Sequence, residues 1–114
     1  MSATNFYLEK GYTPVFRHRD ISGIGTATVW TPTTNTRIVL TGLSISANLA
    51  GTIAFYWASA DTKLFEFYVG GSSTIIPIVH LESSLQNLTL DARTSSGGIN
   101  GWKVTAMGFE IPIS

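Results

Sequence analysis

The sequence predicts an all-β protein, a single-domain antiparallel β-sandwich of jelly-roll type with about eight strands. Val, Ile, Thr and aromatic residues dominate short segments, and Gly, Pro, Asn and Asp interrupt these segments at strand-length intervals. No long stretch shows the apolar period of a helix. The chain has 114 residues and a hydrophobic fraction of 44%, which is enough for one domain with a substantial core.

The expected strands follow one another along almost the whole chain. They are 12–18, 24–31, 36–48, 51–59, 63–70, 73–81, 86–94 and 99–112. Thr31–Asn35 ends the second strand, because proline cannot donate a ladder hydrogen bond and asparagine tolerates turn geometry. Polar or glycine-rich turns separate the later strands at 48–51, 60–62, 70–73 and 95–98.

Two of the long strands change the parity of their apolar residues near a glycine. The change occurs at Gly42 in the strand 36–48 and at Gly108 in the strand 99–112. Because side chains alternate between the two faces of a strand, each change predicts a β-bulge or a bend at the glycine.

Charge is scarce on this chain. It has 7 basic and 7 acidic residues, so the formal net charge is zero and only 12% of the residues are charged. That fraction is about half the usual share for a soluble domain, which favours a protein that packs against other proteins. The scattered basic residues do not make a nucleic-acid surface, and the longest apolar runs are too short to cross a membrane.

No residue pattern indicates catalysis or a cofactor. The absence of cysteine excludes a disulfide scaffold, a thiol nucleophile and a thiolate zinc site. His18 and His80 lie far apart in the sequence without a carboxylate motif, so no metal site is predicted. Glu66 and Glu110 are expected to mark solvent faces of strands and not a catalytic pair. We therefore expect that the protein is not an enzyme, and the N-terminus lacks a signal-peptide pattern.

Residues 1–11 show no firm strand pattern and are expected to form an extended N-terminal arm, with the β-sandwich domain spanning 12–114. The alternative is a frayed tail. Aromatic and charged residues gather in this arm and directly after it. The candidate residues for contact with a capsid protein or another subunit are Phe6, Tyr7, Tyr12, Arg17 and Arg19.

Aromatic residues are also dense in 55–57 and 65–68, which are expected to pair as a hairpin with two aromatic faces. One face belongs to the core. The other is either buried as well, or a subunit contact, or a platform on which a sugar ring stacks. Tyr56 and Tyr68 are the candidates for this aromatic contact face.

The segments Thr28–Pro32 and Thr36–Ser46 resemble parts of small all-β proteins encoded among the structural genes of tailed bacteriophages. A strand that ends in Trp-Thr-Pro is followed by a basic residue that opens a long, glycine-containing strand. The resemblance implies a virion protein, a decoration or cement protein that stabilises the head.

Such a protein would be made in the host cytoplasm, would form a homotrimer, and would contact the major capsid protein or other virion proteins. The resemblance brings no catalytic residue. The alternative function is a carbohydrate-binding or receptor-binding module of a phage tail or fibre.

Overall fold

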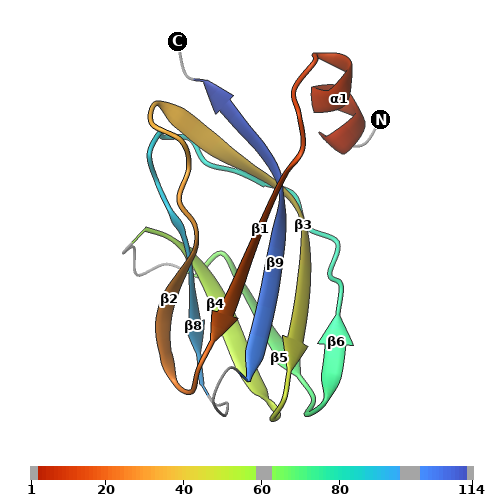
Figure 1. Cartoon of the computed structure of the whole chain (residues 1–114), viewed down its shortest axis with the longest axis vertical. Coiled ribbons are helices and arrows are strands. Elements are labelled where there is room, and N and C mark those ends of the chain that lie inside the picture. Colours follow the sequence, from red (N-terminus) through yellow and green to blue (C-terminus); the bar gives the residue numbers. More distant parts are fainter. Residues whose placement is uncertain (1–2, 59–62, 96–100, 113–114) are drawn as a thin grey trace.

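The structure, a computed structural model, describes residues 3–58, 63–95 and 101–112, and it confirms the predicted antiparallel β-sandwich (Figure 1). Its elements are α1 (Ala3–Glu9), β1 (Val15–Ile21), β2 (Gly25–Trp30), β3 (Thr36–Ala47), β4 (Gly51–Trp57), β5 (Phe65–Val69), β6 (Ser73–Ile75), β7 (Leu81–Glu82), β8 (Leu90–Thr94) and β9 (Trp102–Pro112). The turn expected at 60–62 and most of the turn expected at 95–98 lie outside the described residues.

The strands form two sheets that pack face to face. In the first, which we call sheet A, the order is β1-β9-β3, and β6 and β7 both pair with β3. The strand expected at 73–81 is thus divided into these two short pieces around Pro77, which has no N–H to donate. In the second, sheet B, the order is β2-β8-β4-β5. Each sheet has an inner face toward the shared core and an outer face away from it.

The bulge expected near Gly42 is present. The register of β3 against β9 shifts between Leu40 and Gly42, so Thr41 is the extra residue. Leu40 and Leu43 differ in parity, yet the bulge places both in the main core cluster between the sheets. The bulge therefore keeps one long strand apolar toward the core along its whole length.

β9 has no extra residue at Gly108: it pairs with β1 in unbroken register up to that residue, and the register shift against β3 at Met107 and Gly108 comes from the extra residue of β3. Side-chain alternation continues, and Phe109 and Ile111 lie on the outer face of sheet A. There they form a second buried cluster with Val39 and Tyr7. The apolar residues of β9 therefore change parity because the first part of the strand packs its inner face on the core, whereas Phe109 and Ile111 pack on the outer face.

The expectation of an extended N-terminal arm is also corrected, since residues 3–9 form the helix α1. The helix docks through Tyr7, which is only 5% exposed and whose ring centroid lies 5.2 Å from that of Phe109. Tyr12 is half-buried against the same cluster. Docking removes aromatic surface from water on a part of sheet A that sheet B does not cover.

Candidate functional site

Below α1, the outer face of sheet A is organised in three rows that run across neighbouring strands. The strand register defines the rows: Phe16, Met107 and Gly42 form the first; His18, Thr105 and Ser44 the second; Asp20, Lys103, Ser46 and Thr74 the third. The rows change from apolar near the helix to charged and hydroxylic near the opposite end of the sheet.

The first row is apolar and open to solvent. Phe16 is 61% exposed and Met107 is 36% exposed. The Met107 side chain lies across Gly42, where an added Cβ would stand 2.8 Å from its Cε atom. On α1, Phe6 and Leu8 are exposed to a similar degree. We call these four exposed residues, Phe6, Leu8, Phe16 and Met107, the apolar band.

The second and third rows carry a small polar network. One ring nitrogen of His18 lies 3.0 Å from Thr105 Oγ1, and the other lies 2.7 Å from Asp20 Oδ1. Lys103 Nζ is a looser neighbour of the same carboxylate, at 3.5 Å. The hydrogen bond to His18, with a smaller contribution from Lys103, lowers the pKa of Asp20 below its ordinary value. This carboxylate therefore stays ionised on the surface.

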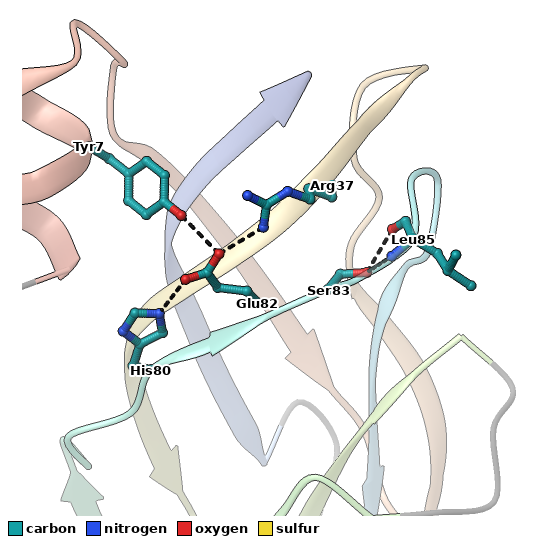
Figure 2. A network of polar contacts seen from close by, with 6 residues as sticks. All are labelled: Tyr7, Arg37, His80, Glu82, Ser83 and Leu85. Atoms are coloured by element: carbon teal, nitrogen blue, oxygen red, sulfur yellow. Dashed lines mark hydrogen bonds and ion pairs between the residues drawn. The ribbon is translucent and has the colours of Figure 1, made fainter. Parts of the chain in front are cut away.

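A second polar network holds the helix to the sheet (Figure 2). Glu82 Oε1 accepts hydrogen bonds from the Tyr7 hydroxyl at 2.9 Å and from Arg37 Nη1 at 2.8 Å, while His80 Nε2 lies 2.9 Å from Oε2. The hydrogen bond from Arg37 has the largest effect, and together these contacts lower the pKa of Glu82 to about 2, although burial alone would raise it. Both carboxylate oxygens are engaged, so this network ties α1 to β3 and β7.

The five residues expected to contact a capsid protein or another subunit do not lie on one common surface. Phe6 is exposed on α1, but Tyr7 belongs to the second buried cluster, Tyr12 packs against it, and both hold the helix in place. Arg17 and Arg19 point to the opposite side of β1 from Phe16, because strand neighbours alternate. This alternation is the signal that could have distinguished Phe16 as an outer-face residue from the sequence.

The two arginines lie at the open edge of the sandwich between β1 and β2. Arg17 Nη1 donates to the Phe16 carbonyl at 3.0 Å, and its Nη2 lies 4.0 Å from Glu110 Oε2. Arg19 is exposed, and its side chain makes no hydrogen bond or ion pair with another described residue. Of the two, Arg19 is the one whose charge is available to a partner.

The pair proposed as an aromatic contact face is also divided. Tyr68 is 69% exposed on the outer face of sheet B, opposite Thr52 on β4. Tyr56 is buried, because the Arg93 guanidinium lies over its ring at 3.8 Å from the centroid. A platform of two rings is therefore not formed, and Tyr68 is the exposed ring of the pair.

Glu110 does not mark a solvent face, in contrast to the expectation. Its Oε2 atom accepts a hydrogen bond from Trp30 Nε1 at 2.9 Å, and its Oε1 accepts one from the Thr33 hydroxyl at 2.7 Å. Burial raises the pKa of Glu110, but the hydrogen bonds from Trp30 and Thr33 outweigh burial and the net shift is downward. This carboxylate therefore lies at the border of the core, where it caps the core by binding the buried Trp30. Glu66, by contrast, is exposed as expected.

Two features are absent from the described residues, 3–58, 63–95 and 101–112. No three His, Asp or Glu residues among them gather closely enough to hold a metal ion. No helix in the described ranges has the length and apolar character needed to span a membrane.

Comparison with known proteins informs the fold. No protein-family model and no curated protein matches the chain. One similar solved structure is the C-terminal CBM6, a carbohydrate-binding module, of the marine laminarinase LamC from Zobellia galactanivorans. It superposes on this chain with a TM-score of 0.52 at 12% sequence identity. The match covers 84% of this chain and 99% of that one. A structure of Bacillus endospore appendages, described as disulfide-linked pili, gives 0.50 at 14% identity, covering 88% and 90%. At these identities the likeness shows a shared β-sandwich fold.

Proposed function

We propose that this protein is a structural subunit that acts through protein–protein contacts, and specifically a decoration or cement protein on the head of a tailed bacteriophage. A fold that occurs both in a carbohydrate-binding module and in a pilus is compatible with a structural or a binding role. The phage assignment comes from the resemblance of Thr28–Pro32 and Thr36–Ser46 to small virion proteins.

The observation that carries the proposal is the apolar band. Phe16 and Met107 are direct cross-strand neighbours, and Met107 is two residues before Phe109 on the same face of β9. Phe109 is covered by Tyr7, whose ring is in edge contact with that of Phe6 at 5.0 Å. Exposed apolar residues therefore lie at both borders of one buried cluster, which is the surface pattern of an interaction site.

The occupant that we assign to the band is a second copy of the chain, with a trimer as the expected assembly. Copies with zero formal net charge do not repel one another by net charge. The pili of the second structural neighbour are described as disulfide-linked, whereas this chain has no cysteine. An assembly of this chain would therefore not be linked by disulfides, and the apolar band offers hydrophobic area for the contact.

Sedimentation velocity over a roughly hundredfold range of concentration tests the proposal. The wild-type protein should associate, and Phe16→Ser should shift it toward monomer. Ile24→Ser is the matched control, because Ile24 is 77% exposed between β1 and β2, away from the band. A wild-type protein that stays monomeric, or equal loss of association in both variants, would overturn self-assembly through this surface.

Attachment to the particle needs a separate assay. Particles from the virus that encodes the chain, assembled without it, should bind the added wild-type protein. We expect Arg19→Gln to weaken that binding at low salt, because Arg19 is exposed and makes no contact with another described charge. Binding that does not change with Arg19→Gln would remove this residue from the attachment surface.

A further inference from the structure

A hollow of about 340 Å³ is formed by residues at one end of sheet A. Figure 1 shows that this end of the sheet is opposite to α1. Described residues at the end of β3 and at the beginnings of β6 and β9 lie around it. The described residues that line it are Ser46, Ala47, Asn48, Ser72, Ser73, Thr74, Gly101 and Lys103. The apolar band and the hollow thus occupy opposite ends of one sheet.

Backbone hydrogen bonds link Asn48 at the end of β3 to Gly101 and Ser72, which precede β9 and β6. The Asn48 N–H donates to the Gly101 carbonyl at 2.7 Å, and the Ser72 N–H donates to the Asn48 carbonyl at 3.2 Å. The strand register aligns Thr74, Ser46 and Lys103 side by side on the outer face. The hollow is therefore preorganised, which lowers the entropic cost of binding a ligand.

The polar side chains of the lining are largely free to bind a ligand. Those of Ser46, Asn48, Ser72 and Thr74 make no hydrogen bond to any described residue. The Ala47 side chain belongs to the core between the sheets, so the apolar surface of the hollow comes from other atoms of its lining. The hollow thus combines several hydroxyls and an amide with a small apolar patch, a combination that suits the hydroxyl groups and the C–H face of a sugar ring.

Lys103 adds a positive charge to this lining. The Lys103 side chain is 57% exposed, and its Nζ lies 3.5 Å from Asp20 Oδ1. His18 lies closer to the same carboxylate, at 2.7 Å. The described lining contains no carboxylate of its own. Lys103 can therefore turn toward an anionic group in the hollow while Asp20 keeps its partner His18.

We propose that this hollow binds an acidic monosaccharide unit, a pyranose ring that carries a carboxylate. In this arrangement Lys103 pairs with the ligand carboxylate, and Asn48, Ser46 and Thr74 bind the ring hydroxyls. A nucleotide fits less well, because the described lining has no aromatic ring on which a base could stack. The inference goes beyond the structural role proposed above and concerns the opposite end of sheet A.

The test is an NMR titration of the whole protein with sodium D-glucuronate, D-glucose and inorganic phosphate in parallel. Glucuronate up to about 50 mM should give saturable shifts confined to the amides around the hollow. Glucose should bind more weakly, because it lacks the carboxylate. Phosphate should cause smaller shifts, because it lacks the ring. Two variants, Lys103→Gln and Asn48→Ala, should each weaken glucuronate binding by about fivefold or more.

Lys63→Gln is the matched control. Lys63 is 53% exposed and paired with Glu66 at 2.8 Å on the other sheet, so it shares the exposure and ion pairing of Lys103 but not its position. Unchanged affinity in this variant is expected. Absence of saturable shifts, shifts that are as large with phosphate as with glucuronate, or equal weakening by Lys63→Gln would each overturn the proposal. None of these outcomes depends on the oligomeric state of the protein.

Discussion

The hydroxyl of Tyr7 donates a hydrogen bond to Glu82 at 2.9 Å, although 75 residues separate them in the sequence. This contact joins a short N-terminal helix to a two-residue strand at the edge of sheet A (Figure 2). Neither element would be stable alone, since isolated helices of this length are marginal in water. Tyr7 supplies both the apolar contact and the polar link that keep the helix on the sheet.

Substitutions at Tyr7 should separate these two contributions. Tyr7→Phe removes only the hydrogen bond and should lower the free energy of unfolding by about 1 kcal/mol. Tyr7→Ala also uncovers Val39 and Phe109, so we expect a loss of about 3 kcal/mol or more. Urea unfolding measures both values. Tyr68→Ala, at an exposed tyrosine, is the control and should stay within about 0.5 kcal/mol of wild type.

The same contact changes what is expected when residues 1–11 are removed. An extended arm could be deleted without effect on the fold, but deletion of α1 uncovers the cluster of Val39, Phe109 and Ile111. The truncated protein should therefore melt at a lower temperature than the full chain. A truncated protein with unchanged thermal stability would show that the helix does not dock in solution.

Acid should loosen the helix through Glu82. The pKa of its carboxyl is lowered from 4.5 to about 2 in the folded protein, so the folded state favours the ionised form. The resulting stability is complete above pH 4.5 and is lost as the pH falls toward 2. We expect the difference in stability between wild type and Glu82→Gln to shrink over this range.

Comparison with Glu82→Gln is necessary because the pKa values of Asp20 and Glu110 are also lowered. Those groups remain in both proteins, so their contributions cancel in the difference. Urea unfolding at several pH values provides the measurement. Stability curves that run parallel between neutral pH and acid would mean that the Glu82 contacts do not stabilise the folded state.

Two glycines of sheet A should respond very differently to a methyl group. An alanine at Gly108 would place its Cβ against the carbonyl oxygen of Val39, which is fixed in the pairing of β3 with β9. At Gly42 the obstacle is the flexible end of Met107, which can move aside. Gly108→Ala should cost about 3 kcal/mol, whereas Gly42→Ala should cost about 1 kcal/mol or less. Equal losses in thermal or urea unfolding would contradict this account.

The sequence was sufficient for the architecture because alternation with period two is strong in the long strands. The parity of Leu40 and Leu43 located the bulge in β3, where the register does shift. The helix could not be predicted in the same way, since seven residues are too few for an apolar period to be recognised. Because the helix was not predicted, nothing was expected to cover the outer face at Phe109. A second bulge or a bend was then the explanation for an apolar residue of that parity.

Which candidate residues are exposed was harder to predict, because exposure depends on what covers each face of a sheet. Tyr7 and Tyr56 are aromatic residues in plausible positions, but long-range partners bury both of them. The hollow is lined by residues from three distant parts of the sequence, so no local motif predicts it. The inward position of Glu110 could have been predicted from the sequence, because Glu110 has the same strand parity as the core residues Val104 and Ala106.

That position of Glu110 leads to a further prediction about the core. Trp30 is 1% exposed, and its indole N–H donates to Glu110 from a strand 80 residues away in the sequence. Glu110→Ala leaves a buried donor without its partner and should cost about 2 kcal/mol. Glu110→Gln keeps an acceptor oxygen and should recover part of the loss.

Glu66→Ala is the matched control for these variants, because Glu66 also lies on a strand and has a charged partner, but is exposed. Its loss should stay within about 0.5 kcal/mol, as for most surface ion pairs. Urea unfolding compares the three variants, and the indole N–H resonance of Trp30 reports directly on the hydrogen bond. A Glu110→Ala protein as stable as Glu66→Ala, with an unshifted indole resonance, would show that Glu110 does not cap the core.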